Sequence, residues 1–83
     1  MGIKLEVFKA PICPHCPATI ELVKEVVSKF DDVEVEIIDI EERPEHASKY
    51  KIYAVPAIAI NGKLKFIGRP SRSELEREIK EAI

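Results

Sequence analysis

The first half of the chain has the pattern of a strand, an amphipathic helix and a second strand, and this order restricts the fold more than any other feature. Residues 3–8 alternate well enough for a strand, and residues 33–39 form a second strand-like run. Between them, residues 19–30 place apolar side chains on one wide helical face, as expected of a helix that packs on a sheet. Because a crossover helix joins parallel strands, the pattern predicts a right-handed βαβ unit.

A turn signal organises the second half. Asn61 and Gly62 separate two apolar segments, residues 57–60 and 63–67, and supply the positive φ angles that a two-residue hairpin turn requires. These two strands are therefore predicted to run antiparallel. Residues 44–51 precede them and have the pattern of a short helix that begins with a proline.

The last segment carries the signals of a helix start. Ser71 and Glu74 have the spacing of a capping box, and Leu75, Ile79 and Ile83 share one helical face. The order of elements is then βαβ, a short α-helix, and ββα. We expect an α/β fold with a small four-stranded mixed sheet and helices on both of its faces.

Size and charge limit the partners that the chain can have. Its 83 residues are 46% hydrophobic and carry a formal net charge of -2, which fits a single domain over residues 1–83. Acidic and basic residues are interleaved, so no basic stripe is available for nucleic acid, and no apolar run reaches the roughly 18 residues that a membrane span needs. We expect a cytoplasmic monomer with no nucleic-acid and no membrane partner.

Two cysteines, Cys13 and Cys16, stand at the start of the first predicted helix. A disulfide between them closes a ring too small to add much stability. A four-ligand zinc site lacks a second pair of cysteines, because only His15 lies nearby and His46 is remote in sequence. A redox pair needs only the residues that are present.

A redox role divides the two thiols. With Cys13 at the helix N-cap, unpaired N–H groups and the helix dipole would favour its thiolate, which makes Cys13 the expected nucleophile and Cys16 the expected resolving thiol. Pro14 suits the first helical turn. A partly protonated His15 would add to the stabilisation of the thiolate, and a solvated His15 without effect is the alternative. Pro17 would cost the helical hydrogen bond to the Cys13 carbonyl, so either the helix begins near Pro17 or its first turn is loose.

Three side chains close to these motifs are expected to lie outside the site. Tyr50 and Tyr53 fit packing positions with the hydroxyl group in water. Lys9 is expected to be solvated, so that its charge couples only weakly to Cys13.

The sequence C-P-H-C after a strand, together with Val55-Pro56 before the hairpin, resembles the thioredoxin superfamily over nearly the whole chain. The short length is most similar to the small archaeal glutaredoxin-like thioredoxins. The resemblance implies a cis Val55–Pro56 peptide bond, with Pro56 near the cysteines and the Val55 backbone pairing with an extended substrate. Val7 stands where these proteins bury an acid, which leaves open what assists deprotonation of Cys16.

The expected function is that of an enzyme, a thiol-disulfide oxidoreductase that reduces protein disulfides through a reversible Cys13–Cys16 disulfide. We expect no cofactor and no metal ion. A separate reductase would supply the electrons, because the chain has no flavin or nicotinamide motif. Three alternatives remain open: a copper or zinc module, an iron-sulfur carrier built from two chains, and an interaction domain with unreactive cysteines.

Overall fold

Strands and helices alternate in the predicted order in the computed structural model, which describes residues 2–52 and 54–82. The elements are β1 (Ile3–Lys9), α1 (Cys16–Val27), β2 (Val33–Asp39), α2 (Pro44–Tyr50), β3 (Ala57–Ile60), β4 (Lys63–Ile67) and α3 (Arg72–Ala82). The predictions for Tyr53 and Ile83 fall outside the described residues. Within them, no helix has both the length and the apolar character needed to cross a membrane.

The sheet is mixed, with strand order β2-β1-β3-β4. Strand β1 pairs in parallel with β2 and antiparallel with β3, so both edges of its backbone are occupied. The β3–β4 pair is an antiparallel hairpin with one irregularity in register, between Ile58 and Ala59. The predicted four-stranded mixed sheet is confirmed.

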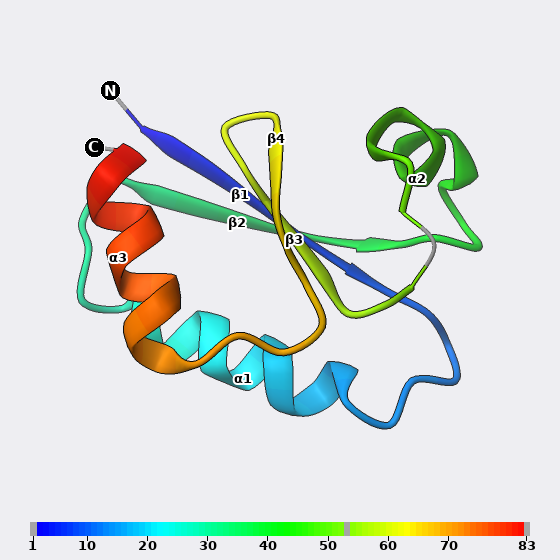
Figure 1. Ribbon diagram of the computed structural model, residues 1–83, viewed down its shortest axis with the longest axis horizontal. Helices are drawn as coiled ribbons and strands as arrows, with labels where there is room; N and C mark the ends of the chain where they lie inside the picture. The colour runs from blue at the N-terminus through cyan, green and yellow to red at the C-terminus, as the bar shows by residue number, and fades with distance from the viewer. Residues whose placement is uncertain (1, 53, 83) are drawn as a thin grey trace.

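The helices cover both faces of this sheet, as Figure 1 shows, with α1 and α3 on one side and α2 on the other. The core under α1 and α3 takes its largest part from alternate residues of β1 and β3 and from the inner sides of the two helices: Ile3, Leu5, Val7, Ile58, Ile60, Val23, Val26, Leu75 and Ile79. The smaller cluster under α2 contains Phe8, Ile38, Ala57 and Ala59, against which Ile40, Tyr50, Ile52, Val55 and Leu64 pack. Adjacent residues of β1 therefore belong to different cores.

The hairpin turn has the predicted backbone conformation and is also tied to the central strand. Asn61 and Gly62 have φ angles of 50° and 83°. The Asn61 N–H donates to the Lys4 carbonyl at 2.8 Å, and the Lys4 N–H donates to Asn61 Oδ1 at 3.0 Å. The register between the hairpin and β1 is therefore fixed both by the β1–β3 ladder and by the two hydrogen bonds between Asn61 and Lys4.

Helix α1 ends three residues earlier than the apolar pattern predicts. Its chain tightens after Val27, where the Lys29 N–H donates to the Val26 carbonyl at 3.1 Å and the Phe30 N–H donates to the Val27 carbonyl at 2.9 Å. Phe30 still packs against the core. An apolar residue that follows a helix can thus continue the apolar pattern without belonging to the helix.

Two ion pairs cross from α1 and the turn after it to α3. Lys29 Nζ lies 2.9 Å from Glu76 Oε1, and Arg72 Nη2 lies 2.7 Å from Glu25 Oε1. All four side chains reach solvent, so these pairs lie at the surface where α1 and α3 meet and not in the core.

The capping box at the start of α3 is confirmed. The Glu74 N–H donates to Ser71 Oγ at 3.2 Å, and the Ser71 N–H donates to Glu74 Oε1 at 3.3 Å. Hydrogen bonds from the Ser71 side chain and backbone hold the pKa of Glu74 below its ordinary value.

Leu75 tests the packing of α3 on the sheet. It is 0% exposed, so Leu75→Ala removes contacts from both helices and leaves a cavity. We expect the free energy of unfolding in urea to fall by about 3 kcal/mol. The control Lys80→Ala, on the exposed side of the same helix, should change it by no more than about 0.5 kcal/mol.

Glu74 tests the capping box through pH. Because its pKa is lowered in the folded state, its ionised form stabilises the protein above the pKa of the unfolded chain, and this contribution is lost as the pH falls through the folded pKa. The thermal midpoint of Glu74→Gln should therefore lie below that of the wild type at pH 7 and approach it as the pH drops below about 4.3. A difference that is independent of pH would contradict this assignment.

Candidate redox site

Cys13 and Cys16 form a disulfide beyond the carboxyl end of β1, with their Cα atoms 5.4 Å apart. The two residues differ in exposure. Cys16 is 3% exposed and begins α1, whereas Cys13 is only partly buried in the loop before the helix. A molecule that approaches from solvent therefore reaches Cys13 first.

The prediction that Cys13 caps the helix is wrong, because the N-cap is His15. The first helical bond runs from the Thr19 N–H to the His15 carbonyl at 3.1 Å, while the Cys16 N–H donates to the Cys13 carbonyl at 3.3 Å in a turn before the helix. Pro17 explains the shift. A helix that begins at Cys16 puts Pro17 in the first turn, where no N–H is needed.

The residues that frame Cys13 lie at the surface. Pro14 and His15 are exposed, and Ile12 is 92% exposed. On the inner side, the Thr19 hydroxyl donates to the His15 carbonyl at 2.9 Å, which adds a second hydrogen bond to the N-cap residue. The loop thus exposes an apolar side chain just before Cys13 in the sequence and an imidazole two residues after it.

An open hollow of about 280 Å³ lies beside the disulfide. The end of β1, the loop after it and the first turns of α1 line this hollow with Lys9, Ala10, Pro11, Cys13, Cys16, Pro17, Ile20 and Glu21. Lys9, which was expected to be solvated, is partly buried and is one of these lining residues. Both sulfur-bearing residues thus line a surface that is open to small molecules.

The Val55–Pro56 peptide bond is cis, as the resemblance implies. Pro56 is buried, and its carbonyl accepts the Gly68 N–H at 2.7 Å. The last β1–β3 pair in this direction joins Phe8 to Ala57, so Pro56 lies at the end of the sheet from which the loop to Cys13 leaves (Figure 1). The two predicted parts of the site are brought to one end of the molecule.

Sequence reasoning missed a buried acid in β1. Val7 is 1% exposed in the core, but its neighbour Glu6 is also buried, at 6% exposure, on the opposite face of the sheet. The prediction of a solvated Tyr50 hydroxyl is wrong, since this hydroxyl donates to Glu6 Oε1 at 2.7 Å. Burial and the bond to Glu6 raise the pKa of Tyr50 to about 12. Strand alternation in β1 places Glu6 and Phe8 on one face of the sheet, but it does not show that Tyr50 of α2 covers that face.

Metal ligands are not clustered in the part of the chain that the structure describes. Within residues 2–52 and 54–82, no three His, Cys, Asp or Glu side chains come together as a metal site would require. His46 lies on α2, in a different element from the cysteines.

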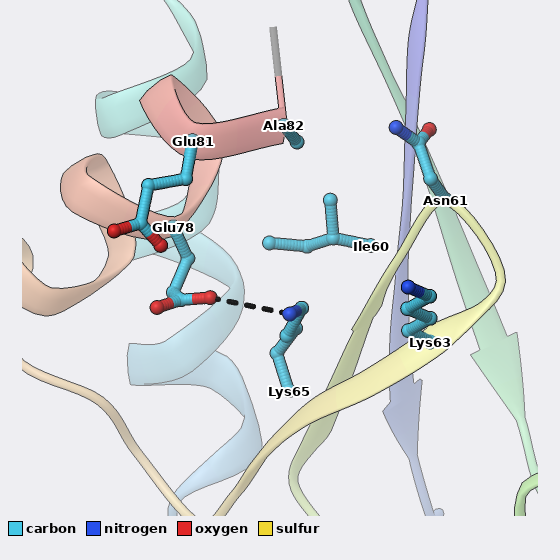
Figure 2. A pocket seen from close by; sticks show the side chains of 7 residues that line it. All are labelled: Ile60, Asn61, Lys63, Lys65, Glu78, Glu81 and Ala82. Atoms are coloured by element: carbon cyan, nitrogen blue, oxygen red, sulfur yellow. Dashed lines mark ion pairs between the residues drawn. The ribbon is translucent and has the colours of Figure 1, made fainter.

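A second cavity, of about 200 Å³, lies at the other end of the sheet (Figure 2). The hairpin and the end of α3 line it, and the ion pair between Lys65 Nζ and Glu78 Oε1, at 3.5 Å, spans part of it. Neither cysteine contributes to this cavity, so it takes no part in the redox site.

Comparison with known proteins agrees with this geometry. A family model described as a thioredoxin domain matches residues 3–80. The chain belongs to the thioredoxin family. It is 46% identical to a protein named Thioredoxin from Methanocaldococcus jannaschii, over 98% of this chain and 96% of that protein. It is 49% identical to a protein named Probable Thioredoxin from Methanothermobacter marburgensis, over 100% of this chain and 99% of that protein.

A solved structure shows the same fold. Mitochondrial Thioredoxin 3 from Saccharomyces cerevisiae, in its oxidized form, superposes with a TM-score of 0.81 at 24% identity, over 95% of this chain and 77% of that one. The predicted thioredoxin-like fold and the resemblance to archaeal members of the family are confirmed. So is the predicted activity: the chain is a thiol-disulfide oxidoreductase.

The unequal burial of the two cysteines gives a test on the reduced protein. Because Cys13 is partly exposed and Cys16 is 3% exposed, iodoacetamide should modify Cys13 faster, by on the order of tenfold at pH 7. Mass spectrometry of peptides from a time course measures both rates in one sample. Equal rates, or faster modification of Cys16, would contradict the assigned difference in access.

Proposed function

We propose that the chain reduces disulfides in other proteins, with Cys13 as the nucleophile and Cys16 as the resolving thiol. The observation that carries this proposal is the unequal exposure of two sulfurs that are within bonding distance of each other. Cys13, which is partly exposed, is open to a partner protein, while the buried Cys16 is shielded until the first exchange is complete.

The start of α1 supports thiolate formation at Cys13. Although Cys13 is not the N-cap, its sulfur can bond to that of Cys16, the first helical residue, and therefore lies beside the positive end of the helix. His15, at the N-cap position, would add positive charge when protonated. Pro14 fixes one φ angle of the intervening turn, and Pro14 and His15 are both proposed to modulate the site without bonding to the substrate.

The proposed cycle transfers two electrons to the substrate. The Cys13 thiolate attacks one substrate sulfur, so that a mixed disulfide forms and the other substrate sulfur leaves as a thiolate. The Cys16 thiolate then attacks Cys13 Sγ, which forms the Cys13–Cys16 disulfide and releases the second substrate sulfur. A separate reductase returns two electrons and two protons to the chain, which needs no cofactor or metal of its own for these steps.

The segment at Val55 and Pro56 is proposed to bind the substrate backbone. Val55 lies just outside β3, and among the described residues no backbone partner bonds to its N–H or C=O group. Pro56 cannot donate a hydrogen bond, and its carbonyl is occupied by Gly68. An extended substrate segment that pairs with Val55 would therefore meet free backbone groups at the end of the sheet next to the redox loop.

The proposed working unit is a monomer, because one chain supplies both cysteines and the Val55–Pro56 segment. The proposed partners are proteins with accessible disulfides and the reductase. A reducing compartment such as the cytoplasm would suit this direction of electron flow.

A trapping experiment tests the roles of the two thiols. Cys16→Ser should accumulate a mixed disulfide between Cys13 and insulin, because the second exchange cannot occur. Non-reducing electrophoresis and mass spectrometry measure the adduct. The matched variant Cys13→Ser should accumulate little adduct, and an adduct that forms mainly through Cys16 would reverse the assignment.

A further inference from the structure

We propose that Tyr50 and Glu6 are positioning residues for protein substrates. The hydrogen bond between them holds α2, and with it the Val55–Pro56 segment, at the place where a substrate backbone would pair. This inference rests on the proposed function, in which Val55 binds the substrate. It adds that substrate binding also depends on a hydrogen bond on the α2 face of the sheet, opposite α1.

Glu6 needs a hydrogen-bond donor because of where it lies. It is in the central strand, paired with Glu36 of β2 and Ala59 of β3, and only 6% exposed. A buried carboxylate without a hydrogen-bond donor destabilises the fold. The Tyr50 hydroxyl of α2 supplies this donor to Glu6 at 2.7 Å, so the hydrogen bond links α2 to the central strand.

The neighbouring acid does not compete for this donor. Glu36 lies 3.4 Å from Lys4 Nζ and 2.8 Å from Arg43 Nη1, and the bond from Arg43 lowers its pKa. Lys4 and Arg43 both pair with Glu36. In the part of the chain that the structure describes, the side chain that donates to Glu6 is therefore Tyr50. The two acids on this face are thus satisfied by different groups.

Apart from the ion pair of its N-cap residue Arg43 with Glu36, helix α2 is attached to the sheet mainly through Tyr50. None of its seven residues is fully buried, and Tyr50 is the residue of α2 that packs against the cluster beneath it. The Tyr50 ring meets the Phe8 ring edge to face, with centroids 5.4 Å apart and an interplanar angle of 66°. The ring supplies the contact area, and the hydroxyl bond sets where the ring sits.

Tyr50 is connected to the proposed substrate-binding segment, Val55 and Pro56, both through side-chain packing and along the chain. Val55 packs in the same cluster as Tyr50 and Phe8, and Phe8 pairs through its backbone with Ala57, which follows Pro56. Along the chain, the direction after Tyr50 is set by Lys51, with φ of 55°, and by the bond from the Ile52 N–H to the Ala47 carbonyl at 3.0 Å. A shift of Tyr50 would therefore move the segment that carries Val55.

The test compares a protein substrate with a small one. Tyr50→Phe keeps the ring and removes the hydroxyl. We expect its KM for insulin to rise by about fivefold, with kcat within about twofold of wild type, when dithiothreitol supplies the electrons. The rate at which the reduced protein, freed of dithiothreitol, reduces DTNB should stay within about twofold, because this small aromatic disulfide does not need to pair with Val55. A purely structural role would not separate the two substrates.

Two further variants sharpen the test. Glu6→Gln keeps an oxygen acceptor, so it should raise the KM for insulin less than Tyr50→Phe does, again with the DTNB rate unchanged. The control Ile79→Val removes one methyl group from the other core and should leave the ratio of the two activities unaltered.

Two results would overturn the inference: an insulin KM that Tyr50→Phe does not change, or an equal loss with both substrates. A wild-type protein that reduces neither insulin nor DTNB would instead overturn the proposed function.

Discussion

Strand β1 is the element on which the other parts of the molecule depend, because its backbone is paired on both edges and its side chains enter both cores. On one face, Leu5 and Val7 pack against the two long helices, α1 and α3. On the other face, Glu6 accepts a hydrogen bond from Tyr50, and Phe8 packs against the Tyr50 ring. The end of the strand leads into the loop that carries Cys13. The loop that carries Cys13 therefore starts from a strand that is paired on both edges.

Local chemistry was sufficient to predict much of the fold. The turn at Asn61 and Gly62 and the capping box at Ser71 and Glu74 were read correctly because each depends on the properties of a few adjacent residues. The parallel pairing of β1 and β2 followed from the length of the connection between them. The two cysteines were found for the same reason, since their spacing and the helix after them are visible in a short stretch of sequence.

Other features could not be derived from local patterns alone. The burial of Glu6 requires β2, β3 and α2 to be in place, and strand alternation shows only which face a residue occupies, not what covers it. The start of α1 was left open between a cap at Cys13 and a helix that begins near Pro17, because Pro14 and Pro17 both fit a first helical turn, and the structure has the second, with α1 beginning at Cys16. The cis bond before Pro56 was inferred from family resemblance alone, because most bonds before proline are trans.

The ion pairs between the α1 region and α3 have a consequence at high temperature. The cost of removing a charge from water falls on heating, whereas the hydrophobic gain per unit of buried area levels off. The pairs of Glu25 with Arg72 and of Lys29 with Glu76 therefore contribute a growing share of what holds these two helices together as the protein warms. Because they are exposed to solvent, that share also depends on ionic strength, so the salt content of the surroundings would influence how much heat the molecule withstands.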